Sequence, residues 1–296
     1  PRRPDYSDPR LGHVIGPGWP DYEHADIIIV GCPQDHGVLR NSGRAGANEA
    51  PNAIRRALYT FPSPSERAGE RICDLGDIMV QPTLEDTHRI HQRIVRRILE
   101  DGKRAIILGG GNDISYPDVS ALHDVTPDLL AFNIDSHFDV RPSDERTSGT
   151  PYRQLLDEGK LAPDRFYEIG CKAEVNAIEH ERYLQEQGIA VFWLSDLRRQ
   201  GIEPLLHELL QRHDASAVFW GFDMDVVRTS DAPGVSASYP IGLSAEEICT
   251  IADIAGRDSR SKIIEISEVN PRHDIDNRTA RLTAQLLARA LRAMLA

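Results

Sequence analysis

The sequence predicts an α/β fold in which a parallel sheet is covered by helices on both faces. Short apolar runs rich in β-branched residues recur along the chain and alternate with segments of helical periodicity. Near-continuous apolar strands are typical of a parallel sheet that is buried on both faces. No linker rich in proline, glycine or serine divides the 296 residues, so we expect one domain over residues 1–296, with residues 1–24 as an N-terminal extension.

The predicted elements follow one another in regular order. Eight apolar runs are predicted strands, at residues 25–31, 71–75, 104–108, 129–135, 166–170, 190–194, 217–223 and 262–269. Seven segments are predicted helices, at residues 50–59, 84–101, 115–123, 175–187, 197–212, 244–255 and 277–295. In the segment 84–101, for example, Ile90, Ile94 and Ile98 mark one apolar stripe. These stripes indicate packing rather than chemistry.

Charge and composition exclude several classes of partner. The net charge of −12 argues against nucleic acid or an anionic membrane as the main partner, because both demand a basic surface. No apolar run approaches the roughly 18 residues that a membrane span requires. The four cysteines show no CxxC pair, so reduced thiols are expected. The first residues lack the apolar stretch of a signal peptide, and we expect a cytoplasmic protein.

Potential metal ligands gather where two of the predicted strands end. In open parallel sheets, ligands bind beyond the carboxyl ends of the strands. After the run 129–135, Asp135, His137 and Asp139 alternate along the chain, and residues two apart in an extended segment point the same way. Asp223 and Asp225 form a second pair of this kind after the run 217–223. We therefore expect these side chains to converge on one point.

Such a cluster would need a cation. Carboxylates packed within a few ångströms repel one another, and one or more would stay protonated at neutral pH without a divalent ion. Mostly oxygen ligands with a single imidazole favour a hard or borderline ion such as Mn²⁺ over Zn²⁺. Either motif alone could be structural, since aspartate at a strand end is a common helix cap. The two motifs together favour a metal site.

Five motifs, in the right order, resemble those of the ureohydrolase (arginase/agmatinase) family. They are a glycine-rich stretch over residues 31–55, Asp135-Ser-His137-Phe-Asp139 (similar to DAHxD), Gly221-Phe-Asp223-Met-Asp225 (similar to SxDxD), the loop 232–244, and Glu268-Val-Asn270-Pro271 (similar to EVNP). The resemblance extends over residues 25–290, nearly the whole chain.

The resemblance implies a fold, a cofactor and a set of ligands. The fold would be a three-layer α/β/α sandwich with an eight-stranded parallel sheet. The cofactor would be a pair of Mn²⁺ ions in each subunit. Asp135 and Asp223 would bridge the two ions, His137 and Asp225 would complete one site, and Asp139 would belong to the other. Family members commonly assemble as trimers or hexamers, so a homo-oligomer is expected.

One motif departs from the family pattern. The family's other histidine ligand lies in a Gly-Gly-(Asp/Gly)-His-Ser segment, whereas residues 109–115 here read GGGNDIS and place Asn112 at the histidine position. An amide oxygen can bind a hard cation, but it is a weaker donor than imidazole toward Mn²⁺. Three alternatives follow: a second site that fills more loosely, a one-metal enzyme, or a protein without catalysis.

The resemblance also implies the reaction, which is hydrolysis of a C–N bond in a guanidine or amidine by a water that the Mn²⁺ ions activate. Asp139 would accept or hold the proton of that water. Glu268 would pair with the cationic C–N group of a small-molecule substrate through a charge-assisted contact. The two predicted catalytic residues are therefore Asp139 and Glu268.

The substrate loop is more specific. Residues 138–141 read FDVR and residues 148–154 read SGTPYRQ, which is similar to formimidoylglutamases rather than arginases. Arginine suits planar recognition of the carboxylates that formimidoylglutamate carries. Arg141 and Arg153, with hydroxyls from Ser148 and Thr150, are the predicted substrate-binding groups, and histidine degradation is the implied setting. The alternatives are a hydrolase of another acidic guanidino or amidino compound, a metal-poor binding or assembly protein, and, for Arg141 alone, an ion pair with Asp144.

Several other residues receive structural interpretations. Five histidines in helical segments are expected to be surface or packing residues: His88, His91, His180, His207 and His213. Cys32 ends the first strand and is expected to be a small core residue rather than a group near the metals. Tyr152 lies where a loop meets a helix, and it could equally shape the pocket mouth or serve structure alone.

Overall fold

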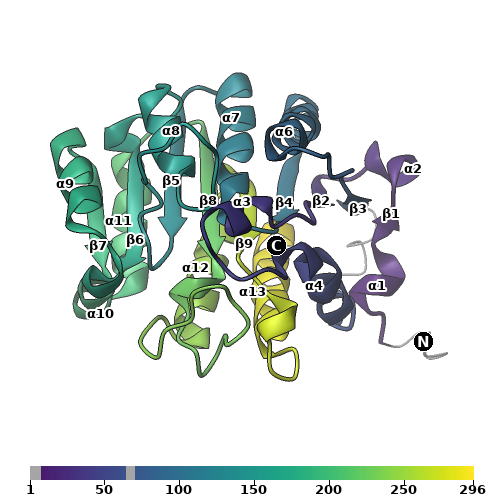
Figure 1. Ribbon diagram of the computed structural model, residues 1–296. Helices are drawn as coiled ribbons and strands as arrows, with labels where there is room; N and C mark the ends of the chain where they lie inside the picture. The colour runs from purple at the N-terminus through teal and green to yellow at the C-terminus, as the bar shows by residue number, and fades with distance from the viewer. Residues whose placement is uncertain (1–7, 65–70) are drawn as a thin grey trace.

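A central parallel sheet, seen in Figure 1, organises the computed structural model, which describes residues 8–64 and 71–296. The strands are β1 (Gly16–Pro17), β2 (Ile27–Gly31), β3 (Ile72–Asp77), β4 (Arg104–Leu108), β5 (Leu129–Ile134), β6 (Phe166–Cys171), β7 (Ala190–Trp193), β8 (Ala217–Asp223) and β9 (Ser261–Ser267). The nine strands pair in the order β1-β3-β2-β4-β9-β8-β5-β6-β7, and every pairing is parallel.

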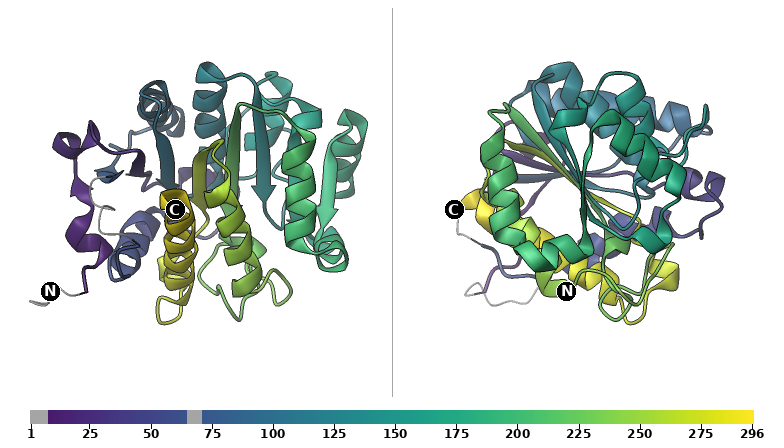
Figure 2. Two further views of the ribbon diagram at one scale, coloured as in Figure 1. Left: turned by 180° about the vertical axis from the view of Figure 1, so that it is seen from behind. Right: turned by 90° about the vertical axis from the view of Figure 1, so that its left-hand side faces the viewer.

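Helices cover both faces of the sheet, as Figure 2 shows from the side. The helices are α1 (Leu11–Val14), α2 (Trp19–Tyr22), α3 (His36–Arg40), α4 (Ala50–Leu58), α6 (Leu84–Glu100), α7 (Ser115–Val125), α8 (Pro151–Asp157), α9 (Ile178–Gln187), α10 (Leu194–Gln200), α11 (Ile202–Arg212), α12 (Ala245–Arg257) and α13 (Arg278–Leu295). Buried side chains of α4 and α10 to α13 form one apolar core with the sheet, and those of α6 to α9 form the other. The predicted three-layer α/β fold is confirmed.

The strand prediction is confirmed for the eight runs, with one addition. The extra strand, β1, is two residues long and pairs with β3 at the edge of the sheet. Two residues carry no periodic pattern, so the sequence gives no signal for this strand. It lies within the predicted N-terminal extension and joins part of that segment to the sheet.

One helix prediction is wrong. The segment 197–212 was expected to be a single helix, but it is divided between α10 and α11. The break is at Gly201, whose φ of 85° is in the left-handed region that glycine adopts without steric cost. Other boundaries follow their local signals: the Ser244 side chain accepts a hydrogen bond from the backbone N–H of Glu247 at the start of α12, and Thr83 does the same for α6. In the described part of the chain, no helix is both long and apolar enough to cross a bilayer.

Candidate metal centre

The register of the sheet brings the ends of the central strands into one row. Phe222 of β8 pairs with Ile134 of β5 on one side and with Ile266 of β9 on the other. The next residues along β8 and β5 are Asp223 and Asp135, so the two carboxylates emerge side by side at the carboxyl edge. Figure 1 shows that the loops after β8 and β9 extend from this same edge. The strand ends therefore supply neighbouring ligands without help from distant loops.

The five ligands predicted at the ends of β5 and β8 converge. Asp135, His137 and Asp225 form one group, and Asp135, Asp139 and Asp223 form another, with the potential ligand atoms of each group within 4.8 Å of one another. His137 Nδ1 lies 3.0 Å from Asp225 Oδ2 and 3.5 Å from Asp135 Oδ1. Of the two predicted bridging ligands, Asp135 belongs to both groups, whereas Asp223 belongs to one.

The electrostatics of the cluster fit a divalent cation. Burial, followed by repulsion from neighbouring aspartates, raises the pKa values of Asp135 and Asp223 well above their usual range. Burial raises the pKa of Asp139 to about 6. Burial opposes the charged forms of His137 and Asp225, but their mutual attraction raises the pKa of the imidazole and lowers that of the carboxyl. A divalent cation would replace the protons that this cluster otherwise holds. It would also satisfy Asp225 Oδ1, a buried oxygen to which the described part of the chain supplies no hydrogen-bond donor.

Asn112 lies beside the cluster in the turn that follows β4. Its Nδ2 donates to Asp139 Oδ2 at 2.7 Å and to Asp135 Oδ2 at 3.4 Å. Its Oδ1 accepts from Ser267 Oγ at 2.8 Å and lies 3.2 Å from Ser115 Oγ. The residue therefore occupies the predicted place next to the carboxylates, with its amide nitrogen toward them.

The two predicted catalytic residues have strained backbones. Asp139 has a φ of 49° and Glu268 a φ of 60°, which is the left-handed region that residues other than glycine rarely adopt. Glu268 is held by its N–H, which donates to Gly110 O at 2.8 Å, and by its Oε1, which accepts from the Asn112 N–H at 3.0 Å. A Cβ at Gly110 would lie 1.6 Å from the carbonyl oxygen of Gln34, so only glycine allows this close approach.

A cavity of about 440 Å³ opens above the cluster. Five of the predicted ligands and catalytic groups line it: His137, Asp139, Asp223, Asp225 and Glu268. Two of the predicted substrate-binding residues, Arg141 and Ser148, also line it. Among the described residues, no carboxylate forms an ion pair with the Arg141 side chain, so the alternative pairing with Asp144 is not found.

The other two predicted substrate-binding residues lie outside the cavity lining. Thr150 is buried, and its hydroxyl donates to Thr147 O and accepts from Thr147 N, both at 3.0 Å. Arg153 forms an ion pair with Asp157 at 2.7 Å along α8 and lies over the ring of Tyr183. Thr150 therefore shapes the loop, and we do not retain Arg153 as a group that contacts the substrate.

Sequence reasoning missed eleven further residues that line the cavity, and those with long polar side chains are Asn41, Arg44, Asn176, His180 and Tyr239. Arg44 and Asn41 lie in the glycine-rich stretch and Tyr239 in the loop 232–244. Both segments are among the family motifs, so they could have indicated that these residues lie near the site. His180 was expected to be a surface or packing residue, and its position on α9 gave no other indication. Burial, and then the charge of Arg141, lower the pKa of His180.

Two other histidines have specific buried partners. His88 Nε2 lies 2.7 Å from Asp113 Oδ2, and His91 Nε2 lies 2.6 Å from Asp118 Oδ1. Both imidazoles are buried, which agrees with a packing role but adds a polar one. Cys32 is fully buried, as expected, and Tyr152 is also fully buried rather than at the pocket mouth.

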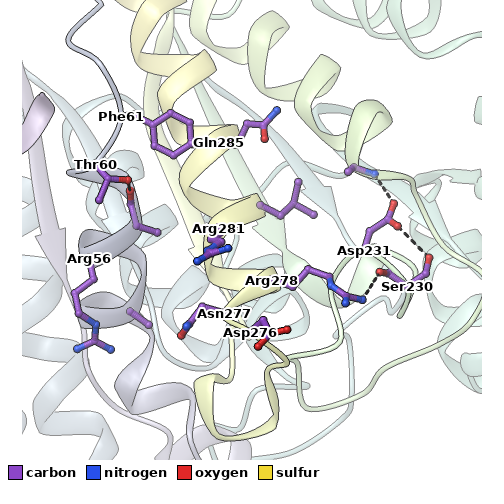
Figure 3. A pocket seen from close by; sticks show the side chains of 14 residues that line it. Arg56, Thr60, Phe61, Ser230, Asp231, Asp276, Asn277, Arg278, Arg281 and Gln285 are labelled. Atoms are coloured by element: carbon purple, nitrogen blue, oxygen red, sulfur yellow. Dashed lines mark hydrogen bonds between the residues drawn. The ribbon is translucent and has the colours of Figure 1, made fainter. Parts of the chain in front are cut away.

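A second cavity, of about 940 Å³, lies between α4, α13 and the loop after β8 (Figure 3). Arg278 donates to Ser230 O at 2.9 Å, and Ser230 Oγ donates to Asp231 at 3.0 Å, which closes one side. Arg56 and Arg281 also line this cavity, but the predicted ligands do not. Although it is larger, its described lining residues include none of the predicted catalytic groups, which line the smaller cavity.

Comparison with known proteins agrees with the geometry. A model of the Arginase family matches residues 25–292 of the chain. The formimidoylglutamase of Staphylococcus epidermidis is 34% identical over 274 residues, which cover 91% of this chain and 86% of that protein.

Two solved structures extend the likeness to three dimensions. Trypanosoma cruzi formiminoglutamase with Mn²⁺₂ has a TM-score of 0.89 at 34% identity, and the match covers 96% of this chain and 97% of that one. Bacillus subtilis formimidoylglutamase has a TM-score of 0.91 at 28% identity, with coverage of 99% and 94%. The similarity therefore includes nearly the whole chain on both sides.

Proposed function

The chain belongs to the arginase family, and we propose that it hydrolyses N-formimidoyl-L-glutamate to L-glutamate and formamide with the help of two Mn²⁺ ions. One observation carries the proposal: the guanidinium of Arg141, which forms no ion pair within residues 8–64 and 71–296, lines the same cavity as the cluster of metal-ligand side chains. A substrate with an amidine at one end and carboxylates at the other matches these two features. The similarity to formimidoylglutamases over nearly the whole chain supports the same substrate.

The two ends of the cavity differ in charge in a way that orients such a substrate. Glu268, a buried carboxylate at the cluster, would pair with the cationic formimidoyl group. Arg141 would bind a carboxylate of the glutamate moiety, with the Ser148 hydroxyl beside it. The Ser148 oxygen already accepts from Asn41 Nδ2 at 3.1 Å, which leaves its own proton free to be donated to the substrate. His180 adds a further polar group to the cavity lining.

The candidate ligands are Asp135, His137, Asp139, Asp223 and Asp225, with Asn112 as a weaker donor. Two Mn²⁺ ions held there would make a water nucleophilic at neutral pH and stabilise the charge that develops at the amidine carbon. Asp139 would take the proton of that water at a carboxylate oxygen, which lies among the candidate ligand atoms. A pKa that burial raises to about 6 suits a carboxylate that must accept a proton and release it again.

The decisive experiment is an assay of the purified protein, reconstituted with Mn²⁺, on formimidoylglutamate, arginine and agmatine. We expect formamide and glutamate release from the first and little turnover of the other two. Faster hydrolysis of agmatine would overturn the substrate while leaving the metal centre standing. A protein that binds no Mn²⁺ after reconstitution would instead be a non-catalytic member of the family.

We also propose that the protein acts in the cytoplasm as a homo-oligomer, a trimer or hexamer. All four cysteines are unpaired and buried, which suits a reducing compartment. The oligomeric state rests on the family resemblance alone. Light scattering on the eluate of a size-exclusion column would measure it directly, and a monomer at micromolar concentration would contradict it.

A further inference from the structure

Asn112 can serve a cation only through its oxygen, so the direction of its amide decides what it contributes. In the structure its Nδ2 is 2.7 Å from a carboxylate oxygen of Asp139, and Oδ1 faces Ser115 and Ser267. Cations bind oxygen lone pairs and are repelled by N–H groups. To act as a ligand, the amide must turn over, which places its two N–H bonds toward the serine hydroxyls. This inference rests on the two-cation site proposed above.

A buried chain of hydrogen bonds reaches Asn112 from the layer of α6 and α7. Ser115 Oγ lies 3.2 Å from Asn112 and 2.7 Å from Glu265 Oε1. Burial, and then the neighbouring charge of Asp118, raise the pKa of Glu265, and Asp118 Oδ1 lies 2.6 Å from His91 Nε2. These side chains are all fully buried, and Glu265 and Asp118 take no part in the reaction proposed above. A row of buried polar groups is costly unless each is satisfied, so its members constrain one another.

Counting protons along the chain fixes the direction of each bond. Among the described residues, no donor reaches the buried oxygens Glu265 Oε2 and Asp118 Oδ2, and one proton shared between these carboxyls would satisfy both. Glu265 Oε1 is then free to accept, and the Ser115 hydroxyl gives its single proton to this nearer partner. Tyr152 donates to Ser115 Oγ at 3.2 Å, which leaves one lone pair on the serine oxygen. Only an N–H of Asn112, and not its carbonyl oxygen, can satisfy that lone pair.

We infer that Glu265, acting through Ser115, is a positioning residue that turns the Asn112 amide so that its oxygen faces the cation site. Ser267 Oγ, 2.8 Å from the amide, can accept the second N–H. The turned oxygen would lie among the oxygens of Asp139 and Asp135, an arrangement that only a cation stabilises. The network thus makes a neutral side chain into an oxygen donor at the place where the family usually has a histidine.

The test compares two variants of Glu265 by their affinity for Mn²⁺ alone. Glu265→Gln keeps an acceptor oxygen for Ser115 and offers its NH₂ to Asp118, which already accepts from His91. The hydrogen bonds behind Asn112 are therefore kept, and the Kd of the second Mn²⁺ should stay within about threefold of the wild-type value. Glu265→Leu removes the acceptor and frees the Ser115 proton for the Asn112 oxygen. The second Mn²⁺ should then bind roughly 10- to 100-fold more weakly, the usual effect of losing a group behind a metal ligand. Equilibrium dialysis counts the ions, and electron paramagnetic resonance detects the spin-coupled pair.

The Asn112→Asp background separates positioning from general damage. A carboxylate presents oxygen in either orientation, so Glu265→Leu should cost less than about threefold there, since the freed Ser115 proton simply donates to Asp. Equal losses in both backgrounds, or no loss with Asn112 in place, would overturn the inference. These readouts use Mn²⁺ without substrate, so inactivity on formimidoylglutamate would overturn the proposed substrate and leave this result unaffected.

A second pair of variants covers the case in which Glu265→Leu does not fold. Ser115→Ala removes the hydroxyl that links Glu265 to Asn112 and should weaken the second Mn²⁺ by a similar 10- to 100-fold. Ser120→Ala is the matched control, because this serine is also buried on α7 but accepts from Lys160 at 3.1 Å, on the part of the helix away from Asn112. The control should bind Mn²⁺ like wild type. If the two alanine variants bind Mn²⁺ equally well, Ser115 does not orient Asn112.

Discussion

The two sides of the metal centre are built by different means. On the β5–β8 side, Asp135, His137, Asp223 and Asp225 carry charge or an imidazole, and the strand register alone brings them together. On the β4–β9 side, the corresponding position holds the neutral Asn112, whose orientation depends on hydroxyls and on a buried acid pair behind them. One side presents ligands directly, and the other depends on a network.

The difference explains how a site can hold two ions with unequal strength. Charged ligands at strand ends repel one another until a cation arrives, so the β5–β8 side gains most from binding. An amide carries no charge and can turn its nitrogen, rather than its oxygen, toward the ion. The β4–β9 side therefore gains less free energy from binding an ion, and a substitution outside the cluster can remove that gain. We expect the first Mn²⁺ to bind tightly and the second more weakly. Between one and two ions per chain should remain after dialysis.

The largest effect should come from breaking the shared ligand. Asp135 belongs to both ligand groups, so Asp135→Asn should remove most Mn²⁺ from both sides. Turnover of formimidoylglutamate should fall by roughly 10³-fold or more, because the charge stabilisation a metal supplies is worth several kcal/mol. Elemental analysis and steady-state kinetics measure the two losses. Asp124→Asn is the control, since this exposed aspartate accepts from Gln92 and belongs to neither ligand group. A variant that keeps two ions would show that Asp135 does not bridge.

The next largest effect should come from a substitution that leaves both sides of the metal centre intact. Arg141→Ala removes the proposed carboxylate contact without touching a ligand, so the Mn²⁺ content should not change. The value of kcat/KM for formimidoylglutamate should fall about 30- to 1000-fold, which corresponds to roughly 2–4 kcal/mol. Arg153→Ala is the matched control, because Arg153 lies on α8, which follows the loop of Arg141. Since Arg153 pairs with Asp157, its replacement should change kcat/KM by less than about threefold. The reverse ranking of the two variants would restore Arg153 to the site.

The same contrast accounts for what the sequence could predict. The strands and the β5–β8 ligands were predictable because a period of two along an extended chain is a local property, visible in Asp135, His137 and Asp139. The Glu265 network was not, because it joins residues up to 174 positions apart, such as His91 and Glu265, through packing between layers. Arg153 was misplaced for a related reason: its partner four residues later becomes a neighbour only once α8 exists.

A smaller effect should come from replacing the weak donor itself. Asn112→His supplies an imidazole, a stronger donor toward Mn²⁺, where the amide now lies. The apparent Kd of the second ion should fall on the order of tenfold, about 1.4 kcal/mol, with little change in the first. Titration of metal-stripped protein with Mn²⁺, followed by electron paramagnetic resonance, resolves the two steps. Unchanged affinity would mean that residue 112 does not contact the ion. Binding of both ions would then depend on the β5–β8 ligands.

The smallest effect is a change in metal-induced stabilisation with pH. Burial raises the pKa of Asp139 to about 6, above its ordinary value of 3.8. Protonation of this group therefore stabilises the metal-free fold. The contribution is fully present below pH 3.8 and is lost as the pH rises through about 6. The pKa values of Asp135, Asp223 and His137 are also raised, so they have the same sign, whereas Asp225 has a lowered pKa and is already ionised. Mn²⁺ must displace the protons of the raised groups, so it competes better as the pH increases.

The melting temperature of metal-stripped protein with and without Mn²⁺ therefore tests the electrostatics of the cluster. At pH 7.5 and an ion concentration 100 times Kd, we expect a stabilisation of about 2.7 kcal/mol, which is on the order of 5 °C for a chain of this size. At pH 5 and the same ion concentration the shift should be below about 2 °C, because a proton on Asp139, whose pKa burial raises to about 6, opposes binding. Asp135→Asn should show no shift at either pH. An equal or larger shift at pH 5 in the wild-type protein would mean that the ligands are already ionised in the metal-free fold. In that case mutual repulsion would not set the strength of the β5–β8 side, and the contrast between the two sides would need another cause.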